Sequence, residues 1–328
     1  MQQKQKCRNV RALAAAVAEA LEPRRLLAGI ESGVLVARGT EAADVISLRR
    51  TGPDDVIVTT NGNEQTFDMD NFSGVRLEGL GGDDRFQMID PLVSPVVRNT
   101  TVMGGAGWDA VDYSTRTEDL RFSGFAQPDT RTPFHFLRVT SGLQEDRIDS
   151  NVEHFAGGSG DDDFWLHGQL LEDDAPRAVS MEGFGGDDHF SHPADLTATM
   201  YGGAGNDLFE EDDWESRFTA IYAGDGNDVI DFNNEGRADF LDAGPGTDTI
   251  SLWGSHREVI DLRPYLGLEN VEGAGNTTVI GNELDNRILA SNGDGPVTLI
   301  GNGGNDTLVG SEEADQLDGG EGDDSLAS

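Results

Sequence analysis

The chain has 328 residues and a formal net charge of −38, from 61 acidic and 23 basic residues. Aromatic residues make up 7% of the sequence and there are 43 glycines, so few large side chains are available for an ordinary globular core. Because nucleic-acid binding needs clustered cations, this charge argues against nucleic acid as a partner and favours cations.

Residues 1–29 differ from the rest of the chain and predict a targeting segment. They carry six basic and two acidic residues, and the Ala-rich run Val10–Leu21 predicts a helix that is too short and too polar to span a membrane. The sequence Leu21-Glu22-Pro23-Arg24-Arg25-Leu26-Leu27 resembles the LEPR-XLL motif. That motif stands near the start of large secreted or surface proteins of planctomycete bacteria, so the resemblance implies an extracellular or cell-surface location. The alternative is an ordinary helix that ends at Pro23.

The cysteine content points to a source of stability other than disulfides. Cys7 is the only cysteine, so the chain can form no internal disulfide. A secreted chain of this size without disulfides needs another covalent or coordinate link, and a bound metal is the usual substitute.

Residues 30–78 predict short strands rather than helices. Their apolar runs are rich in β-branched residues and are separated by turn sequences. The stretch Gly39–Ile46 keeps the first glycine, the Asp and the apolar residue of the repeat that follows it in the chain. We interpret 30–78 as degenerate N-terminal capping coils, because the terminal units of a repeat array are usually atypical. The predicted strands are Val34–Val36, Val45–Leu48 and Val56–Val58.

The region 79–328 is built on an eight-residue unit of the form Gly-Gly-x-Gly-x-Asp-x-apolar. The nine copies begin at Gly79, Gly104, Gly157, Gly183, Gly202, Ala223, Ala243, Gly301 and Gly319. The fourth position is always Gly and the eighth is always apolar, whereas the first two positions also admit residues such as Leu80 and Phe184. The sixth position is always Asp: Asp84, Asp109, Asp162, Asp188, Asp207, Asp228, Asp248, Asp306 and Asp324.

Each fixed position of the unit has a physical reason. Glycine adopts a positive φ at little cost and lets the backbone pass close to an ion. Aspartate supplies a hard, charged oxygen ligand on a short stem. The apolar residues at both ends of the turn point into a core that is shared with the next copy, so stacked copies bury a continuous apolar column.

The unit resembles the RTX (repeats-in-toxin) calcium-binding nonapeptide. The resemblance implies an all-β fold, a right-handed parallel β-roll or β-solenoid with calcium-binding turns, in which each Ca²⁺ lies between successive coils. It implies that the nine aspartates named above are metal ligands. A calcium-free, Gly/Asp-rich β-solenoid is one alternative, and a flexible linker, which would not keep the apolar positions in register, is another. The glycines that the resemblance adds to the metal site are Gly104, Gly157, Gly183, Gly202, Gly226, Gly301 and Gly319.

The spacing of the copies departs from the tandem nine-residue repeat of that family. Most copies here start about 20 residues apart, which favours one calcium turn per coil and a plainer turn on the other side. Two long gaps predict insertions near 112–153 and 254–272. Two degenerate copies, Gly281–Ile288 and Gly310–Leu317, keep part of the unit.

No catalytic motif accompanies the repeats. The sequence contains neither His-Glu-x-x-His nor a Gly-x-Ser-x-Gly elbow, and we interpret His189 and His192 as chance surface histidines. We therefore predict a secreted or cell-surface protein that binds calcium, has a structural or adhesive role, and is not an enzyme. Its expected partners are calcium ions and a cell-surface or matrix component. The alternative is an extracellular carbohydrate-active or other enzyme built on a calcium-stabilised solenoid.

Overall fold

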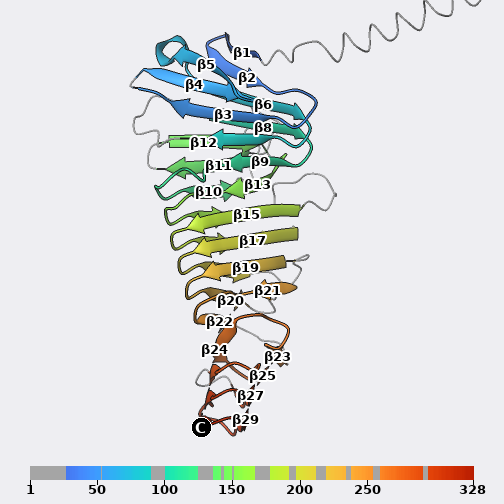
Figure 1. Cartoon of the computed structure of the whole chain (residues 1–328). Coiled ribbons are helices and arrows are strands. Elements are labelled where there is room, and N and C mark those ends of the chain that lie inside the picture. The colour runs from blue at the N-terminus through green and yellow to red at the C-terminus, as the bar shows by residue number, and fades with distance from the viewer. Residues whose placement is uncertain are drawn as a thin grey trace, which may run out of the picture.

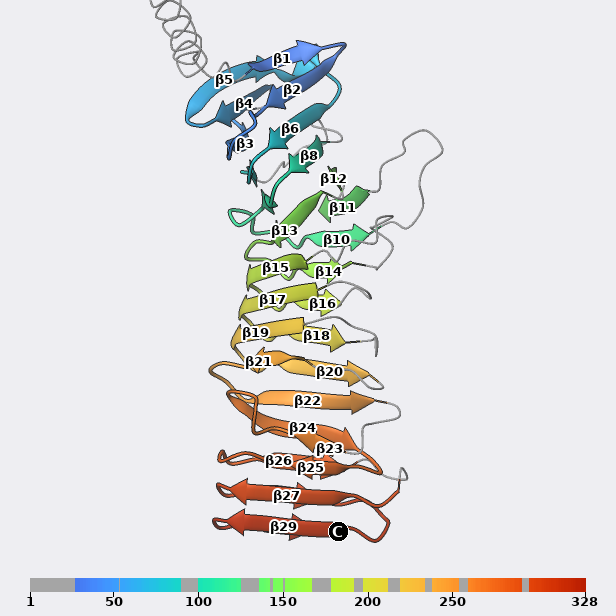
Figure 2. The same ribbon diagram turned by 90° about the vertical axis from the view of Figure 1, so that its right-hand side faces the viewer.

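The computed structural model shows a long stack of β-strands (Figures 1 and 2). It describes residues 27–52, 54–89, 100–124, 136–141, 144–149, 151–166, 178–191, 197–211, 219–233, 238–253, 259–290 and 295–328. In these ranges the only helical element is the 3₁₀ turn η1 (Met69–Asn71). The predicted all-β solenoid is therefore confirmed. The predicted helix Val10–Leu21, and all but the last residue of the LEPR-XLL match, lie outside the described residues.

The strands form three sheets. The first sheet has 16 strands: β1 (Leu27–Glu31), β2 (Val34–Arg38), β6 (Val75–Gly81), β8 (Thr100–Ala106), β10 (Arg121–Gly124), β11 (Phe136–Ser141), β12 (Gln144–Asp149), β14 (Asp163–Trp165), β16 (His189–Ser191), β18 (Leu208–Glu211), β20 (Val229–Asn233), β22 (Asp248–Trp253), β24 (Leu268–Ala274), β26 (Arg287–Ala290), β28 (Thr307–Val309) and β30 (Ser325–Ala327). The second has 10 strands: β3 (Val45–Arg50), β4 (Asp55–Thr60), β5 (Asn63–Asp68), β7 (Arg85–Met88), β9 (Asp109–Asp112), β13 (Val152–Ala156), β15 (Ala178–Gly185), β17 (Thr197–Ala204), β19 (Thr219–Asp225) and β21 (Phe240–Asp242). In the C-terminal coils the third sheet takes the place of the second: β23 (Val259–Asp261), β25 (Thr278–Ile280), β27 (Thr298–Gly303) and β29 (Gln316–Glu321).

The core lies between the sheets and is built from the apolar positions of the unit. Strands β14, β16 and β18 of successive coils pair in parallel without a register shift, so that Phe164, Phe190 and Phe209 are directly opposite one another. These three side chains are fully buried, and their rings stack with centroids 4.8 and 4.9 Å apart. The period-two alternation of each strand thus directs one residue of every copy into a common column.

The N-terminal end is closed by antiparallel strands. β1 pairs with β2, and β3, β4 and β5 form an antiparallel meander at one edge of the second sheet. We call residues 27–72 the N-terminal cap. The degenerate unit Gly39–Ile46 forms the turn from β2 into β3, which pairs in parallel with β7 of the first regular coil.

The predicted insertion 112–153 contributes strands to the first sheet. β10, β11 and β12 form an antiparallel meander, with β12 parallel to β8 on one side and β10 parallel to β14 on the other. Before this meander, the unit turns lead from the first sheet to the second, as from β6 to β7. After it, they lead from the second sheet to the first, as from β15 to β16. The meander therefore moves the unit turns from one edge of the solenoid to the other.

Candidate metal-binding turns

The aspartate at the sixth position of each unit enters a ladder of hydrogen bonds along the solenoid axis. The backbone N–H of Asp188 donates to Oδ1 of Asp207 at 2.8 Å, and that of Asp207 donates to Oδ1 of Asp228 at 2.8 Å. We call this arrangement the inner ladder. Each carboxylate is thereby held on the core side of the turn by the coil before it. The same bond joins Asp44 to Asp84, Asp84 to Asp109, Asp162 to Asp188, Asp228 to Asp248, Asn286 to Asp306 and Asp306 to Asp324.

The second oxygen of most of these carboxylates is buried without a hydrogen-bond partner. This is true of Oδ2 in Asp84, Asp109, Asp188, Asp207, Asp228, Asp248 and Asp306. A buried, unpaired carboxylate oxygen is costly, and buried charges in proteins are normally paired or bound to a metal. The turns therefore present a row of buried, unpaired oxygens that need a cation as a partner.

The first residue of the unit leaves the space into which these oxygens point. A Cβ placed on Gly79 would lie 2.1 Å from Oδ2 of Asp84 and 2.3 Å from the carbonyl oxygen of Gly104 in the next coil. The corresponding distances at Gly202 are 2.1 Å to Asp207 Oδ2 and 2.3 Å to the carbonyl oxygen of the next coil. Oxygens from two coils thus converge, and Ca²⁺ binds carboxylate and carbonyl oxygens at about 2.3–2.6 Å.

Two turns carry alanine at this first position, Ala223 and Ala243. Both alanines are buried, and Oδ2 of Asp228 and of Asp248 still has no hydrogen-bond partner. The unpaired oxygen is therefore a property of the turn and does not depend on glycine at its first position.

Burial raises the pKa of these carboxyl groups. The pKa reaches about 8 for Asp188 and about 7 for Asp84, Asp207 and Asp248. In each case loss of solvation on burial is the main cause, opposed by the backbone N–H that donates to the carboxylate. At neutral pH such a group either holds a proton or needs a cation beside it.

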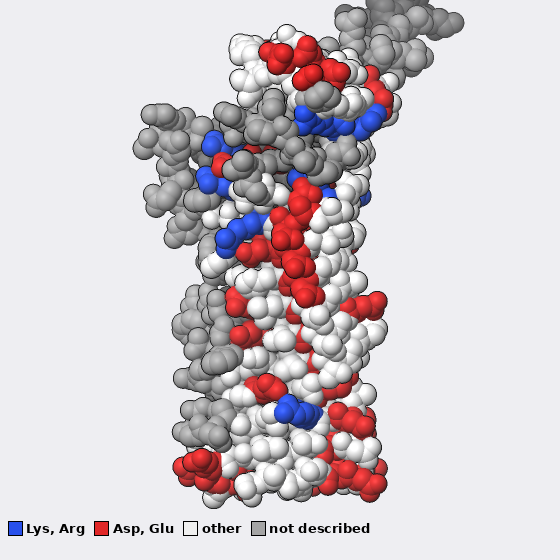
Figure 3. Space-filling model, turned by 90° about the vertical axis from the view of Figure 1, so that its left-hand side faces the viewer, with Lys and Arg blue, Asp and Glu red and all other residues white. Residues whose placement is uncertain are grey.

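The described residues offer these carboxylates little internal counter-charge. Between 151 and 262 the described part of the chain contains no Lys or Arg. Figure 3 shows acidic side chains in a row along the long axis, with most of the basic side chains near the N-terminal end. No group of three or more His, Cys, Asp or Glu gathers in the described ranges, so the other ligands of a cation would be main-chain carbonyl oxygens.

The fourth position is glycine because consecutive turns stack in close contact. A Cβ on Gly226 would lie 1.6 Å from the carbonyl oxygen of Gly205, and one on Gly205 would lie 1.8 Å from that of Gly186. The φ of Gly226 is 153°, which side chains rarely allow. The second position also has a positive φ in most turns, even where it is Leu80 or Phe184.

The predicted glycine ligands fall into three groups. The carbonyl oxygens of Gly104, Gly301 and Gly319 lie against the first glycine of the coil before them, as that of Gly202 does at 2.7 Å from a Cβ on Gly183. Gly226 is at the fourth position, and its carbonyl oxygen meets the next turn at Gly246. Gly157 and Gly183 are first-position glycines that face the carboxylates of their own turns, Asp162 and Asp188.

Two glutamates outside the units also belong to the inner ladder. Glu153 Oε2 accepts from the N–H of Asp109, and Glu269 Oε2 accepts from that of Asp248, both at 2.9 Å. Each carboxylate replaces the missing aspartate where a coil lacks the unit. Sequence reasoning missed them because no neighbouring motif residue marks them.

A second row of side-chain bonds, the outer ladder, follows the fifth position. Asp187 Oδ1 accepts from the N–H of Asn206, and Asn206 Oδ1 accepts from that of Asn227, so these bonds run opposite to those of the inner ladder. The sequence carried a signal for this ladder. The fifth residue is Asp or Asn in seven of the nine copies: Asp83, Asp161, Asp187, Asn206, Asn227, Asn305 and Asp323.

Comparison with known families agrees with this geometry at part of the chain. A model of the family described as RTX calcium-binding nonapeptide repeat (4 copies) matches residues 199–210, 220–234 and 298–327. The chain carries RTX-type repeats. The matched ranges cover the turns of Asp207, Asp228, Asp306 and Asp324. None of the curated proteins compared with the chain matches it.

Proposed function

We propose that this chain is a secreted or cell-surface protein whose repeats bind Ca²⁺ ions that stabilise the solenoid, in a structural or adhesive role. The observation that supports this most directly is the row of seven buried Oδ2 atoms without partners. RTX-type repeats in a β-solenoid are associated with calcium binding, and the family match supports Ca²⁺ as the ion.

The chemistry of the turns favours Ca²⁺ over Mg²⁺. The residues that would hold the ion are the sixth-position aspartate and carbonyl oxygens of the same and the next coil. Ca²⁺ accepts six to eight oxygens in flexible geometry, whereas Mg²⁺ requires near-ideal octahedral geometry and gives up water reluctantly. Bound Ca²⁺ would balance the negative charge of carboxylates that have no described basic side chain beside them.

Calcium binding would also make folding depend on the environment. An ion that binds only the folded state stabilises that state by mass action. Extracellular calcium modules bind at about 10⁻⁴–10⁻³ M, a range that cytosolic calcium does not reach. We infer that the repeats fold after export, and the LEPR-XLL resemblance supports that location. The described residues include no helix with the length and apolar character needed to cross a membrane.

A structural role fits the placement of the acidic residues. The buried carboxylates of the units are arranged as a ladder with one member per coil, which suits repeated cation binding rather than a single reacting centre. We therefore propose a non-catalytic protein.

Calcium titration of the full chain tests this function. The chelated protein should be less compact, poorer in β-structure and lower in melting temperature than the calcium form by X-ray scattering and circular dichroism, and millimolar Ca²⁺ should restore the compact, β-rich form. Mg²⁺ at the same concentration is the matched control and should not do so. A chelated protein that is compact, β-rich and equal in melting temperature to the calcium form would contradict the proposal.

A further inference from the structure

Four turns differ from the others by one hydrogen bond. In each, the backbone N–H of the second residue donates to the side-chain oxygen of the sixth residue in the same turn. We call these closed turns. The bonds are Thr40 to Asp44 Oδ2 at 2.5 Å, Gly158 to Asp162 Oδ2 at 2.6 Å, Asn282 to Asn286 Oδ1 at 2.8 Å and Ser311 to Asp315 Oδ2 at 2.7 Å.

The backbone separates the two kinds of turn as well. None of the second residues of the closed turns has a positive φ, whereas the second residue of every other unit has one. We call those other turns open turns. Their second residues are Leu80, Gly105, Phe184, Gly203, Gly224, Gly244, Asn302 and Gly320.

Strand length follows the same division. The strand before each closed turn ends just ahead of the unit, as β13 does at Ala156 and β28 at Val309. Strands that lead into open turns continue into the unit, as β15 does to Gly185 and β17 to Ala204; the exception is β21, which ends at Asp242. In an open turn the second N–H is free to pair with the next coil, as Gly224 does with the carbonyl oxygen of Ala243 at 3.2 Å. The N–H of the second residue therefore donates either to the neighbouring coil or to the sixth side chain of its own turn.

The carboxylates of the closed turns have no oxygen left without a partner. Oδ1 of Asp162 accepts from the N–H of Leu120 at 2.8 Å and Oδ2 accepts from Gly158, so neither oxygen calls for a cation. In the turn of Asp315, the Ser311 hydroxyl also donates to Oδ1 at 3.0 Å. A metal ion would have to displace these bonds.

We propose that only the open turns bind calcium and that the turn Gly157–Asp162, which has every residue of the motif, is closed by its own backbone and takes no ion. This assignment rests on the proposed function, because it states which turns hold the calcium ions that the proposed function requires. It removes Asp162 from the predicted ligands and excludes Asp44 and Asp315.

The neighbour of the Gly157–Asp162 turn explains why a full motif remains closed. This turn stacks on residues 113–120, which carry no unit. The N–H of Ser159 donates to the carbonyl oxygen of Arg116 at 3.0 Å, and a Cβ on Gly158 would lie 2.5 Å from that oxygen. The stacked backbone of a different turn thus holds the Gly157–Asp162 turn in the closed form.

Two matched pairs of substitutions test the assignment. Asp162→Asn and Asp315→Asn alter closed turns, and Asp207→Asn and Asp306→Asn alter open ones. The ions bound per chain at saturating Ca²⁺ are counted by native mass spectrometry and equilibrium dialysis on the full chain. We expect the closed-turn variants to bind as many ions as the wild type, and each open-turn variant to lose at least one.

Stability in chelator gives a second readout that does not depend on ion counting. Asp162→Asn should lower the melting temperature with or without calcium, because it removes an acceptor that is used in both states. Asp207→Asn should lower it only with calcium. Loss of an ion in Asp162→Asn, with calcium bound by the wild type, would overturn this assignment alone. A wild type that binds no calcium would overturn the proposed function together with it.

Discussion

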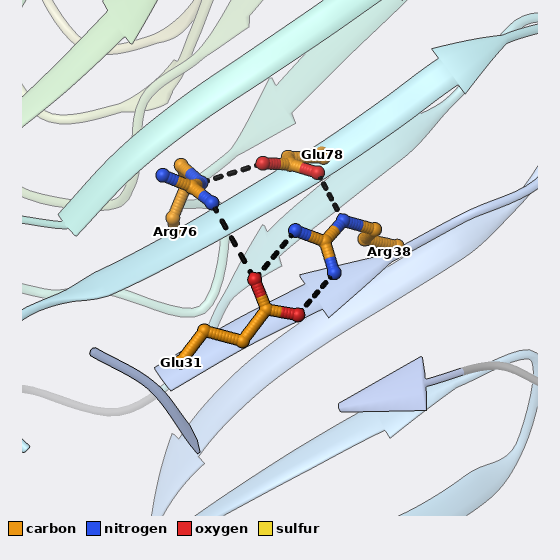
Figure 4. Close-up of polar contacts among 4 residues, drawn as sticks. All are labelled: Glu31, Arg38, Arg76 and Glu78. Carbon is orange, nitrogen blue, oxygen red and sulfur yellow. Dashed lines mark hydrogen bonds and ion pairs between the residues drawn. The ribbon is translucent and has the colours of Figure 1, made fainter. Parts of the chain in front are cut away.

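The N-terminal cap and the regular coils at 178–253 balance their acidic residues in different ways. In the cap, Arg38 forms an ion pair at 2.5 Å with Glu78 of the adjoining strand β6, and Arg76 of that strand contacts the same carboxylate at 2.5 Å (Figure 4). Glu31 completes this group through Arg38. The coils have no described Lys or Arg and keep their carboxylate oxygens buried and unpaired.

The aspartate of the unit shows this difference most directly. Asp44 in the cap accepts from Thr40 through both its N–H and its hydroxyl, and from Asn61 Nδ2 at 2.5 Å. Asp207 in the coils receives one backbone bond at Oδ1 and none at Oδ2. The same repeat position is thus satisfied by the chain itself at one end and keeps a buried, unpaired oxygen in the coils.

The largest expected effect is on calcium removal. Under the proposed function only the coils depend on an external cation, so chelator should raise amide hydrogen exchange strongly across 178–253 while β2, β3 and β4 stay protected. Hydrogen exchange with mass spectrometry resolves the two regions in one experiment. Equal loss of protection in both regions would contradict the difference between the cap and the coils.

The next effect concerns the close stacking of the coils. Gly226→Ala forces a Cβ into the carbonyl oxygen of Gly205 at a φ of 153°, and we expect a loss of about 2 kcal/mol or more in unfolding free energy. Gly52→Ala is the matched control near the cap, where a Cβ would meet nothing within 4 Å. We expect that control to change stability by less than about 0.5 kcal/mol. The check is denaturant unfolding in Ca²⁺, and similar losses in both variants would argue against tight stacking.

A third effect is the response to pH. The pKa of Asp188 is raised to about 8 and that of Asp207 to about 7, against an unfolded value of about 4, so the folded chain binds more protons between these limits. In chelator, the contribution of these groups to stability should therefore be greatest at and below about pH 4 and fall as the pH rises toward 8. With Ca²⁺ the carboxylates must be ionised to bind, and calcium affinity should rise over the same range. Melting curves at pH 5, 6, 7 and 8 with and without calcium would show opposite slopes, and parallel slopes would contradict the prediction.

The smallest effect is expected in the cap itself. Arg38→Gln removes ion pairs that are partly exposed, and such pairs contribute about 0–1 kcal/mol. The loss should shrink in high salt and be the same with and without calcium. A calcium-dependent loss would show that the cap is not independent of the coils.

The sequence was sufficient to predict the parts that repeat. The eighth-position residues, such as Phe164 and Phe190, form the buried column, and the sixth-position aspartates lie together along the turns. Both follow from local geometry that every copy shares. The outer ladder also repeats, and its signal in the sequence is the Asp or Asn at the fifth position of most copies.

The features that escaped prediction depend on neighbours in space. Glu153 and Glu269 occupy ladder positions only because of the coils on which they stack. Asp162 stands in a full motif, but its turn is closed by contact with a segment that includes Leu120, 42 residues earlier in the chain. The eight-residue pattern does not show which sheet the chain leaves before the turn and which sheet it enters after it. The sequence therefore carries no signal that the unit turns change edge at β10–β12.

That change of edge has a consequence for cooperativity. In a linear array, each repeat influences the others through its immediate neighbour. The inner ladder of Asp84 and Asp109 reaches Glu153 on one edge, and the ladder that includes Asp162 and Asp188 runs along the other. Because the two arrays follow different edges of the solenoid, we expect them, under the proposed function, to respond to calcium as separate cooperative units within one chain.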